Sequence, residues 1–93
     1  MKNLFDIKGK VIVITGGSGI IGKCIARYLA EQGAKIVILG RAVEVGKQLE
    51  AELNQVSEAL FLVTDVMNKE LLEENKKAIL ERFGTIDVLL NAA

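Results

Sequence analysis

The sequence predicts an α/β fold, the N-terminal half of a doubly wound parallel sheet with the element order βαβαβαβ. Four short apolar runs alternate with three segments of helical periodicity, a pattern typical of parallel strands joined by right-handed crossovers. The runs are almost continuously apolar, as strands buried on both faces are. A glycine-rich loop separates the first run from the first helical segment, where sheets of this kind place a ligand.

The first strand is predicted at residues 11–14, where Val-Ile-Val-Ile is β-branched throughout. A helix follows the glycine loop, and Gly33 is placed to end it. Apolar residues recur in this helix at helical spacing and predict one buried stripe. The stripe consists of Ile21, Cys24, Ile25, Tyr28 and Leu29.

The second and third strands are predicted at residues 36–39 and 60–63, and Gly40-Arg41 leaves the second strand. The helix between these strands is marked by Val45, Leu49 and Leu53. Spacing of three to four residues predicts that these three side chains face the sheet.

The fourth strand is predicted at residues 86–90, after a helix that Gly84 stops. This third helix is marked by Leu72, Ile79 and Phe83. In a four-stranded half sheet the last strand is an unpaired edge, so association of copies through that edge is an expectation. We expect residues 1–93 to form one dinucleotide-binding domain that stops before the catalytic half.

Composition excludes several classes of function. The chain has 93 residues, 51% of them hydrophobic, and a formal net charge of zero, so nothing suggests attraction to nucleic acid or to a membrane surface. No apolar run approaches the ~20 residues of a membrane span. The sequence has no histidine, and Cys24 is its single cysteine. We therefore expect no metal site and no internal disulfide. A reducing, cytoplasmic compartment fits.

The stretch TGGSGIIGKC, residues 15–24, fits three kinds of nucleotide loop. It contains G-x-G-x-x-G, it contains G-x-x-x-x-G-K, and it nearly matches T-G-x-x-x-G-x-G. In each kind a strand ends, glycines turn the backbone, and the unpaired N–H groups of the next helix favour an anion. The first pattern uses Gly17, Gly19 and Gly22.

The second pattern would make the loop a triphosphate site, with Lys23 as its lysine. This interpretation fails at Cys24, because that position needs a hydroxyl that can bind Mg²⁺. The dinucleotide interpretation asks for an acid after the second strand, where it would bind the ribose of NAD. Gly40 and Arg41 stand there instead. Gly40 makes room for a 2′-phosphate, and Arg41 can bind it with charge-assisted hydrogen bonds. The sequence therefore predicts NADP(H) as cofactor, with NAD(H) as second choice.

The chain resembles the N-terminal part of the short-chain dehydrogenase/reductase family, whose cofactor domain has the Rossmann fold. The match covers nearly the whole chain but only about the first third of a family domain. Four segments in order carry the resemblance: Gly9-Lys10-Val11, Thr15-Gly16-Gly17-Ser18, Asp65-Val66, and IDVLLNAA at residues 86–93.

The resemblance implies a set of cofactor-binding residues. In the family the glycine loop wraps the pyrophosphate and the adenosine ribose, Gly40 and Arg41 would flank the 2′ position, and Asp65 would bind the adenine amino group. Asp65 could also be a helix N-cap, and both roles could hold. A structural role is expected for Asp87. The whole set is Gly16, Gly17, Ser18, Gly19, Ile20, Ile21, Gly22, Gly40, Arg41, Asp65, Val66, Asn91 and Ala92.

Two departures from the family pattern matter. Ile20 replaces the second loop glycine and Gly19 stands beside it, a form similar to that of reductases of sugar acids. The family's catalytic serine and Tyr-x-x-x-Lys pair are absent, so the chain alone is expected to be inactive. The implied activity is oxidation or reduction of a small alcohol or carbonyl substrate by the full-length enzyme. A non-catalytic NADPH-binding module and an inactive fragment are the alternatives.

Overall fold

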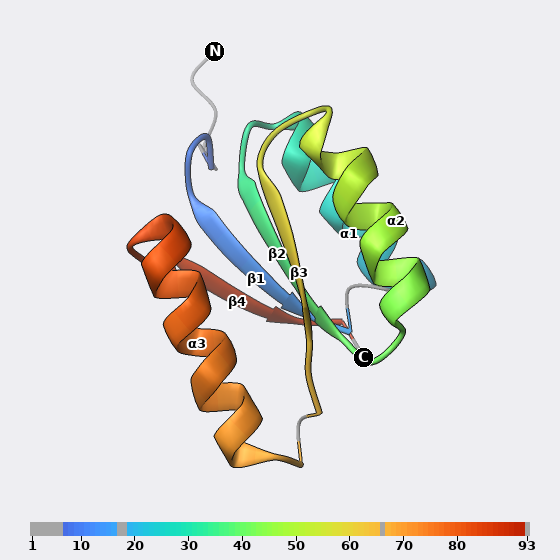
Figure 1. The fold of residues 1–93 in the computed structure, drawn as a ribbon. Coiled ribbons are helices and arrows are strands. Elements are labelled where there is room, and N and C mark those ends of the chain that lie inside the picture. The colour runs from blue at the N-terminus through green and yellow to red at the C-terminus, as the bar shows by residue number, and fades with distance from the viewer. Residues whose placement is uncertain (1–6, 17–18, 66, 93) are drawn as a thin grey trace.

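The computed structural model describes residues 7–16, 19–65 and 67–92, and within them four strands form one parallel sheet in the order β3-β2-β1-β4. Helices alternate with the strands, and Figure 1 shows α1 and α2 on one face of the sheet and α3 on the other. This arrangement confirms the predicted fold class. The elements are β1 (Val11–Thr15), α1 (Ile20–Glu31), β2 (Lys35–Gly40), α2 (Val43–Asn54), β3 (Ala59–Val63), α3 (Lys69–Phe83) and β4 (Val88–Asn91).

The central strands β1 and β2 are buried on both faces, as their continuous apolar runs predict. Successive side chains alternate between the two faces. The face toward α1 and α2 carries Ile12, Ile14, Ile36 and Ile38, which pack with Leu49, Leu53 and Phe61. The face toward α3 carries Val11, Val13, Val37 and Leu39, which pack with Ile79.

Helix α1 packs on the sheet through small residues rather than through its predicted stripe. Its buried positions are Gly22, Ala26 and Ala30, and only Ile25 and Leu29 of the predicted stripe lie partly buried beside them. Tyr28 is 62% exposed, and Ile21 and Cys24 are exposed as well, so burial of these three residues was a wrong prediction. Small side chains every four residues let the helix axis approach the sheet, which turns the bulky neighbouring positions outward.

Left-handed glycines end two helices where the sequence predicts it. Gly33 has a φ of 91° just after α1, and its N–H donates to Ala30 O at 2.9 Å. Gly84 has a φ of 82° and its N–H donates to Leu80 O at 2.8 Å, which ends α3. Both positions favour glycine because a side chain is strained at positive φ.

The two edges of the sheet differ. Two side chains of α2 bind the outer edge of β3. The Asn54 side-chain amide bonds to both the N–H and the C=O of Ala59, and the Glu50 carboxylate accepts a hydrogen bond from the Phe61 N–H. Strand β4 is the opposite edge, and Leu89 on it is 66% exposed. This confirms the expected edge position of the fourth strand; association through it stays a prediction.

Asp87 joins the start of β4 to β1. Its Oδ2 accepts a hydrogen bond of 2.8 Å from Val11 N, and its own N–H donates to Val11 O at 2.9 Å. A structural role for Asp87, as expected, is therefore visible in these two bonds.

We expect Asp87→Ala to lower the free energy of unfolding by about 1–2 kcal/mol, because the Val11 N–H loses its partner beside the buried end of β1. Asp87→Asn keeps an acceptor oxygen in the same position, so its free energy of unfolding should fall by less. Urea unfolding followed by circular dichroism measures both. An alanine variant as stable as the parent would contradict this role.

An exposed ion pair connects the two helices that share a face. Arg27 of α1 donates from Nε and Nη2 to the two carboxylate oxygens of Glu52 of α2, at 2.6 and 3.0 Å. The hydrogen bond from Arg27 holds the pKa of Glu52 below its ordinary value of 4.5, and the carboxylate raises the pKa of Arg27 in return.

This pair predicts a small pH dependence of stability. The folded-state pKa of Glu52 is lowered, so its contribution is fully present above pH 4.5 and is lost as the pH falls through the folded value. Glu52→Gln should therefore lower the melting temperature slightly near neutral pH, and this difference should shrink toward about pH 3, as the folded carboxylate begins to take up a proton. Glu81→Gln, an exposed change on α3, is the matched control. An equal difference at both pH values would contradict the prediction.

Candidate functional site

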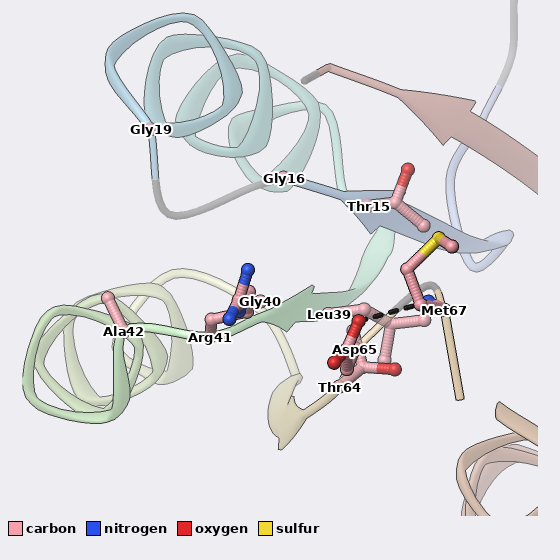
Figure 2. A pocket seen from close by; sticks show the side chains of 10 residues that line it. All are labelled: Thr15, Gly16, Gly19, Leu39, Gly40, Arg41, Ala42, Thr64, Asp65 and Met67. Atoms are coloured by element: carbon pink, nitrogen blue, oxygen red, sulfur yellow. Dashed lines mark hydrogen bonds between the residues drawn. The ribbon is translucent and has the colours of Figure 1, made fainter. Parts of the chain in front are cut away.

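A pocket of about 440 Å³ opens at the carboxyl ends of β1, β2 and β3, where ligands bind in sheets of this type. Figure 2 shows side chains from the three strand ends and the following loops converging on it. The lining residues are Thr15, Gly16, Gly19, Leu39, Gly40, Arg41, Ala42, Thr64, Asp65 and Met67. Arg41 and Asp65 are the ionisable side chains among them.

The glycine loop begins where β1 ends. Gly16 has a φ of 72°, and its N–H donates to Leu39 O at 2.9 Å, so the chain turns at once beside β2. Gly19 is the N-cap of α1 and makes no side-chain capping bond, and the first turn of α1 contains no acidic residue. Among the described residues no side chain caps the N–H groups at this helix start, and the helix dipole favours an anion there.

Gly40 and Arg41 form the second wall. Gly40 is the last residue of β2 and is buried, whereas the Arg41 side chain is exposed. In Figure 2 the Arg41 guanidinium projects from the end of β2 toward the side of the pocket where Gly16 and Gly19 lie. A ligand phosphate between these walls would meet a positive side chain and the positive end of a helix.

Asp65 forms part of the third wall, close to Gly40, because Thr64 N–H donates to Gly40 O at 2.9 Å. Its Oδ1 accepts from Met67 N at 3.0 Å, and its carbonyl accepts from Asn68 N at 2.9 Å. The N-cap of α3 is Asn68, whose Oδ1 accepts from Leu71 N. The alternative that Asp65 caps this helix was therefore wrong, since the chain makes a turn before α3 begins.

Thr64 adds an unsatisfied polar group at the pocket wall. The residue is 3% exposed, and its Oγ1 is buried without a hydrogen-bond partner among the described residues. A buried hydroxyl without a partner is costly, so a water molecule or a ligand that bonded to it would be stabilised. The polar groups and the volume of the pocket fit the adenosine and phosphate part of a nucleotide.

Asn91 and Ala92 lie at the same edge of the sheet, on the other side of β1. Thr15 pairs with Leu39 of β2 on one side and with Asn91 of β4 on the other. The Thr15 hydroxyl donates to Asn91 Oδ1 at 3.2 Å, and Ala92 N–H donates to Thr15 O at 2.9 Å. Neither residue lines the pocket.

The pocket thus brings together five of the predicted residues: Gly16, Gly19, Gly40, Arg41 and Asp65. Ile20, Ile21 and Gly22 form the first turn of α1 and do not line it, and Gly17, Ser18 and Val66 lie outside the described residues. The sequence prediction missed five lining residues, although each stands at a strand end or within four residues of one. These are Thr15, Leu39, Ala42, Thr64 and Met67.

Residues 10–93 match the sequence profile of the short chain dehydrogenase family. The chain belongs to this family. The short-chain dehydrogenase resemblance expected from the four sequence segments is thereby confirmed, and the sugar-acid subset stays a prediction.

Curated relatives in the family are longer proteins. The chain is 39% identical over 89 residues to the uncharacterized oxidoreductase UxuB of Bacillus subtilis, covering 95% of this chain and 32% of the relative. It is 45% identical over 91 residues to the uncharacterized oxidoreductase Lmo0432 of Listeria monocytogenes, covering 92% of this chain and 36% of the relative. The chain therefore spans about a third of the length of these relatives.

Solved short-chain dehydrogenase structures superpose closely on the fold. An NAD⁺-bound xylitol dehydrogenase matches with a TM-score of 0.86 and 34% identity, over 91% of this chain and 33% of that protein. The L-sorbose reductase of Gluconobacter frateurii, complexed with NADPH and L-sorbose, matches with a TM-score of 0.86 and 33% identity, over 96% of this chain and 35% of the reductase.

Two features are absent from the described residues. Those residues contain no group of three or more acidic or cysteine side chains that could hold a metal ion. They also contain no helix with the length and apolar character that crossing a membrane requires.

Proposed function

We propose that this chain is the NADP(H)-binding part of an oxidoreductase that acts on a small alcohol or carbonyl compound. The observation that carries the proposal is the placement of Arg41 beside the side-chain-free Gly40, in one pocket with the start of α1, which no described side chain caps. A 2′-phosphate needs space and a cation, and Gly40 and Arg41 supply both. Membership of the short-chain dehydrogenase family supports the oxidoreductase class.

The ligand would run along the carboxyl edge of the sheet. The pyrophosphate would lie at Gly16, Gly19 and the first turn of α1, where the predicted Gly17, Ser18, Ile20, Ile21 and Gly22 also belong. The adenosine would occupy the pocket between Arg41 and Asp65, with Val66 against its ring. Asn91 and Ala92 lie across β1 from that pocket, on the side where the nicotinamide ribose would extend.

The bound nicotinamide would supply hydride transfer, which no side chain of this chain can perform. The chain itself would bind and orient the cofactor. The ionisable groups of the pocket that could do so are Arg41 and Asp65. The family's catalytic serine and Tyr-x-x-x-Lys are not in the sequence, so we propose that the 93-residue chain alone is inactive. A sugar or polyol is the substrate class we favour, because xylitol dehydrogenase and L-sorbose reductase are among the similar structures. The form of the glycine loop, with Ile20 after Gly19, is our reason to include sugar acids.

Direct titration tests the proposal. Isothermal calorimetry of the purified chain with NADPH, NADH, 2′,5′-ADP and Mg-ATP should show NADPH and 2′,5′-ADP binding more tightly than NADH, and Mg-ATP binding weakest. Tighter binding of NADH would favour the second choice of cofactor. Absence of heat and of amide chemical-shift changes with all four ligands would refute a nucleotide function for this pocket.

A further inference from the structure

Met67 is both highly exposed and part of the pocket wall. Its side chain is 86% exposed, yet it lines the pocket between the strand ends. Figure 2 shows it projecting from the turn after β3 toward Thr15 at the end of β1. Covering a large apolar side chain with a ligand ring removes apolar surface from water, which favours binding. The Met67 side chain stands where such a ring would enter the pocket.

The backbone of Met67 is held in place while its side chain is not. Asp65 accepts the Met67 N–H through Oδ1 at 3.0 Å, and its carbonyl accepts the next N–H, that of Asn68, at 2.9 Å. Asn68 in turn caps α3 through Leu71 N. The turn is thus tied to the helix start, and the unbranched thioether can still rotate about three side-chain bonds.

The opposite walls of the pocket have a matching character. Leu39 and Ala42 contribute apolar surface, and Arg41 contributes charge at the outer end. A flat aromatic ring placed among them would have polar partners at its edge, from Asp65 and Thr64, and an open face toward Met67. Thioether sulfur packs favourably against aromatic rings.

We propose that Met67 is a ligand-contacting residue that folds over the adenine ring of the bound dinucleotide, and that Asp65 positions it. This inference rests on the proposed function. One carboxylate oxygen of Asp65 holds the Met67 backbone, and in this proposal the other would bind the ligand. The affinity of the chain for the adenine part of the cofactor then depends on Met67, which lies outside the glycine loop.

Methyl NMR tests the contact directly. The chain contains two methionines, so labelling their methyl groups with ¹³C yields two signals, and Met67→Leu removes one and assigns it. Titration with 2′,5′-ADP or NADPH should shift the Met67 signal upfield through the ring current, whereas pyrophosphate, which has no ring, should leave it in place.

Affinity measurements provide the second readout. Met67→Ala should weaken 2′,5′-ADP binding about threefold to tenfold, and Met67→Leu, which keeps most of the apolar surface, should stay within about twofold of the parent. Pyrophosphate affinity should be the same in all three proteins. Circular dichroism checks that each variant is folded.

The possible failures are distinguishable. If 2′,5′-ADP shifts the amide signals of Gly19 and Gly40 but neither the Met67 methyl signal nor the affinity of Met67→Ala changes, the inference is wrong and the proposed function stands. If no ligand shifts any amide signal, both are wrong.

Discussion

Replacing Gly46 by alanine is expected to destabilise the protein strongly, although glycine-to-alanine changes inside helices normally stabilise by about 0.5–1 kcal/mol. Gly46 is buried in α2, against the sheet. A Cβ at this position would lie 2.1 Å from Cε1 of Phe61 and within 2.5 Å of two more ring atoms. Phe61 is itself buried in the core, so neither group can move freely. We expect a loss of about 2–3 kcal/mol in the free energy of unfolding.

Urea unfolding of Gly46→Ala measures this loss against Gln48→Ala, an exposed change in the same helix that should stay within about 0.5 kcal/mol of the parent. The double variant Gly46→Ala/Phe61→Val removes the opposing ring. It should therefore be less destabilised than the sum of the two single changes. A single alanine variant as stable as the parent would show that α2 shifts outward at no cost.

Replacing Arg41 by alanine should have the largest effect on ligand binding. The Arg41 side chain is exposed at the pocket wall, beside Gly40, and a 2′-phosphate there would accept charge-assisted hydrogen bonds from it. Loss of these bonds, at about 1.5–3 kcal/mol, corresponds to roughly tenfold to hundredfold weaker NADPH binding. NADH lacks the phosphate, so its affinity should change by less than about twofold.

Calorimetry with both cofactors measures the change. Arg41→Lys keeps the charge but not the forked geometry, so it should lie between the parent and Arg41→Ala. Lys77→Ala on α3 removes an exposed charge away from the pocket and serves as the matched control. Equal NADPH affinity in the parent and in Arg41→Ala would remove Arg41 from the site.

Strand and helix positions followed from the sequence because local patterns specify them. The apolar runs predicted all four strands to within two residues at each end, and Gly33 and Gly84 lie at helix ends as expected. The glycine loop and the family resemblance predicted five of the pocket residues, which come together because parallel strands bring their carboxyl ends to one edge of the sheet.

Tertiary packing decided what local patterns could not. Periodicity placed Tyr28 and Cys24 on a buried stripe, but the close approach of α1 through Gly22, Ala26 and Ala30 turned both outward. Spacing alone also allowed Asp65 to cap α3. The structure assigns that role to Asn68, because the chain turns once more before the helix starts.

The sequence by itself determined the order of elements and the glycine loop, because each depends on residues close together in the chain. The alternation of strands and helices then indicated the parallel sheet, and four segments in order indicated the family. Only the tertiary structure decided that Thr64 has a buried hydroxyl without a partner among the described residues and that Met67 stands at the pocket mouth. These features depend on distances between segments that the sheet brings together, from Thr15 in β1 to the turn after β3. Such distances are set by packing and leave no local pattern in the sequence.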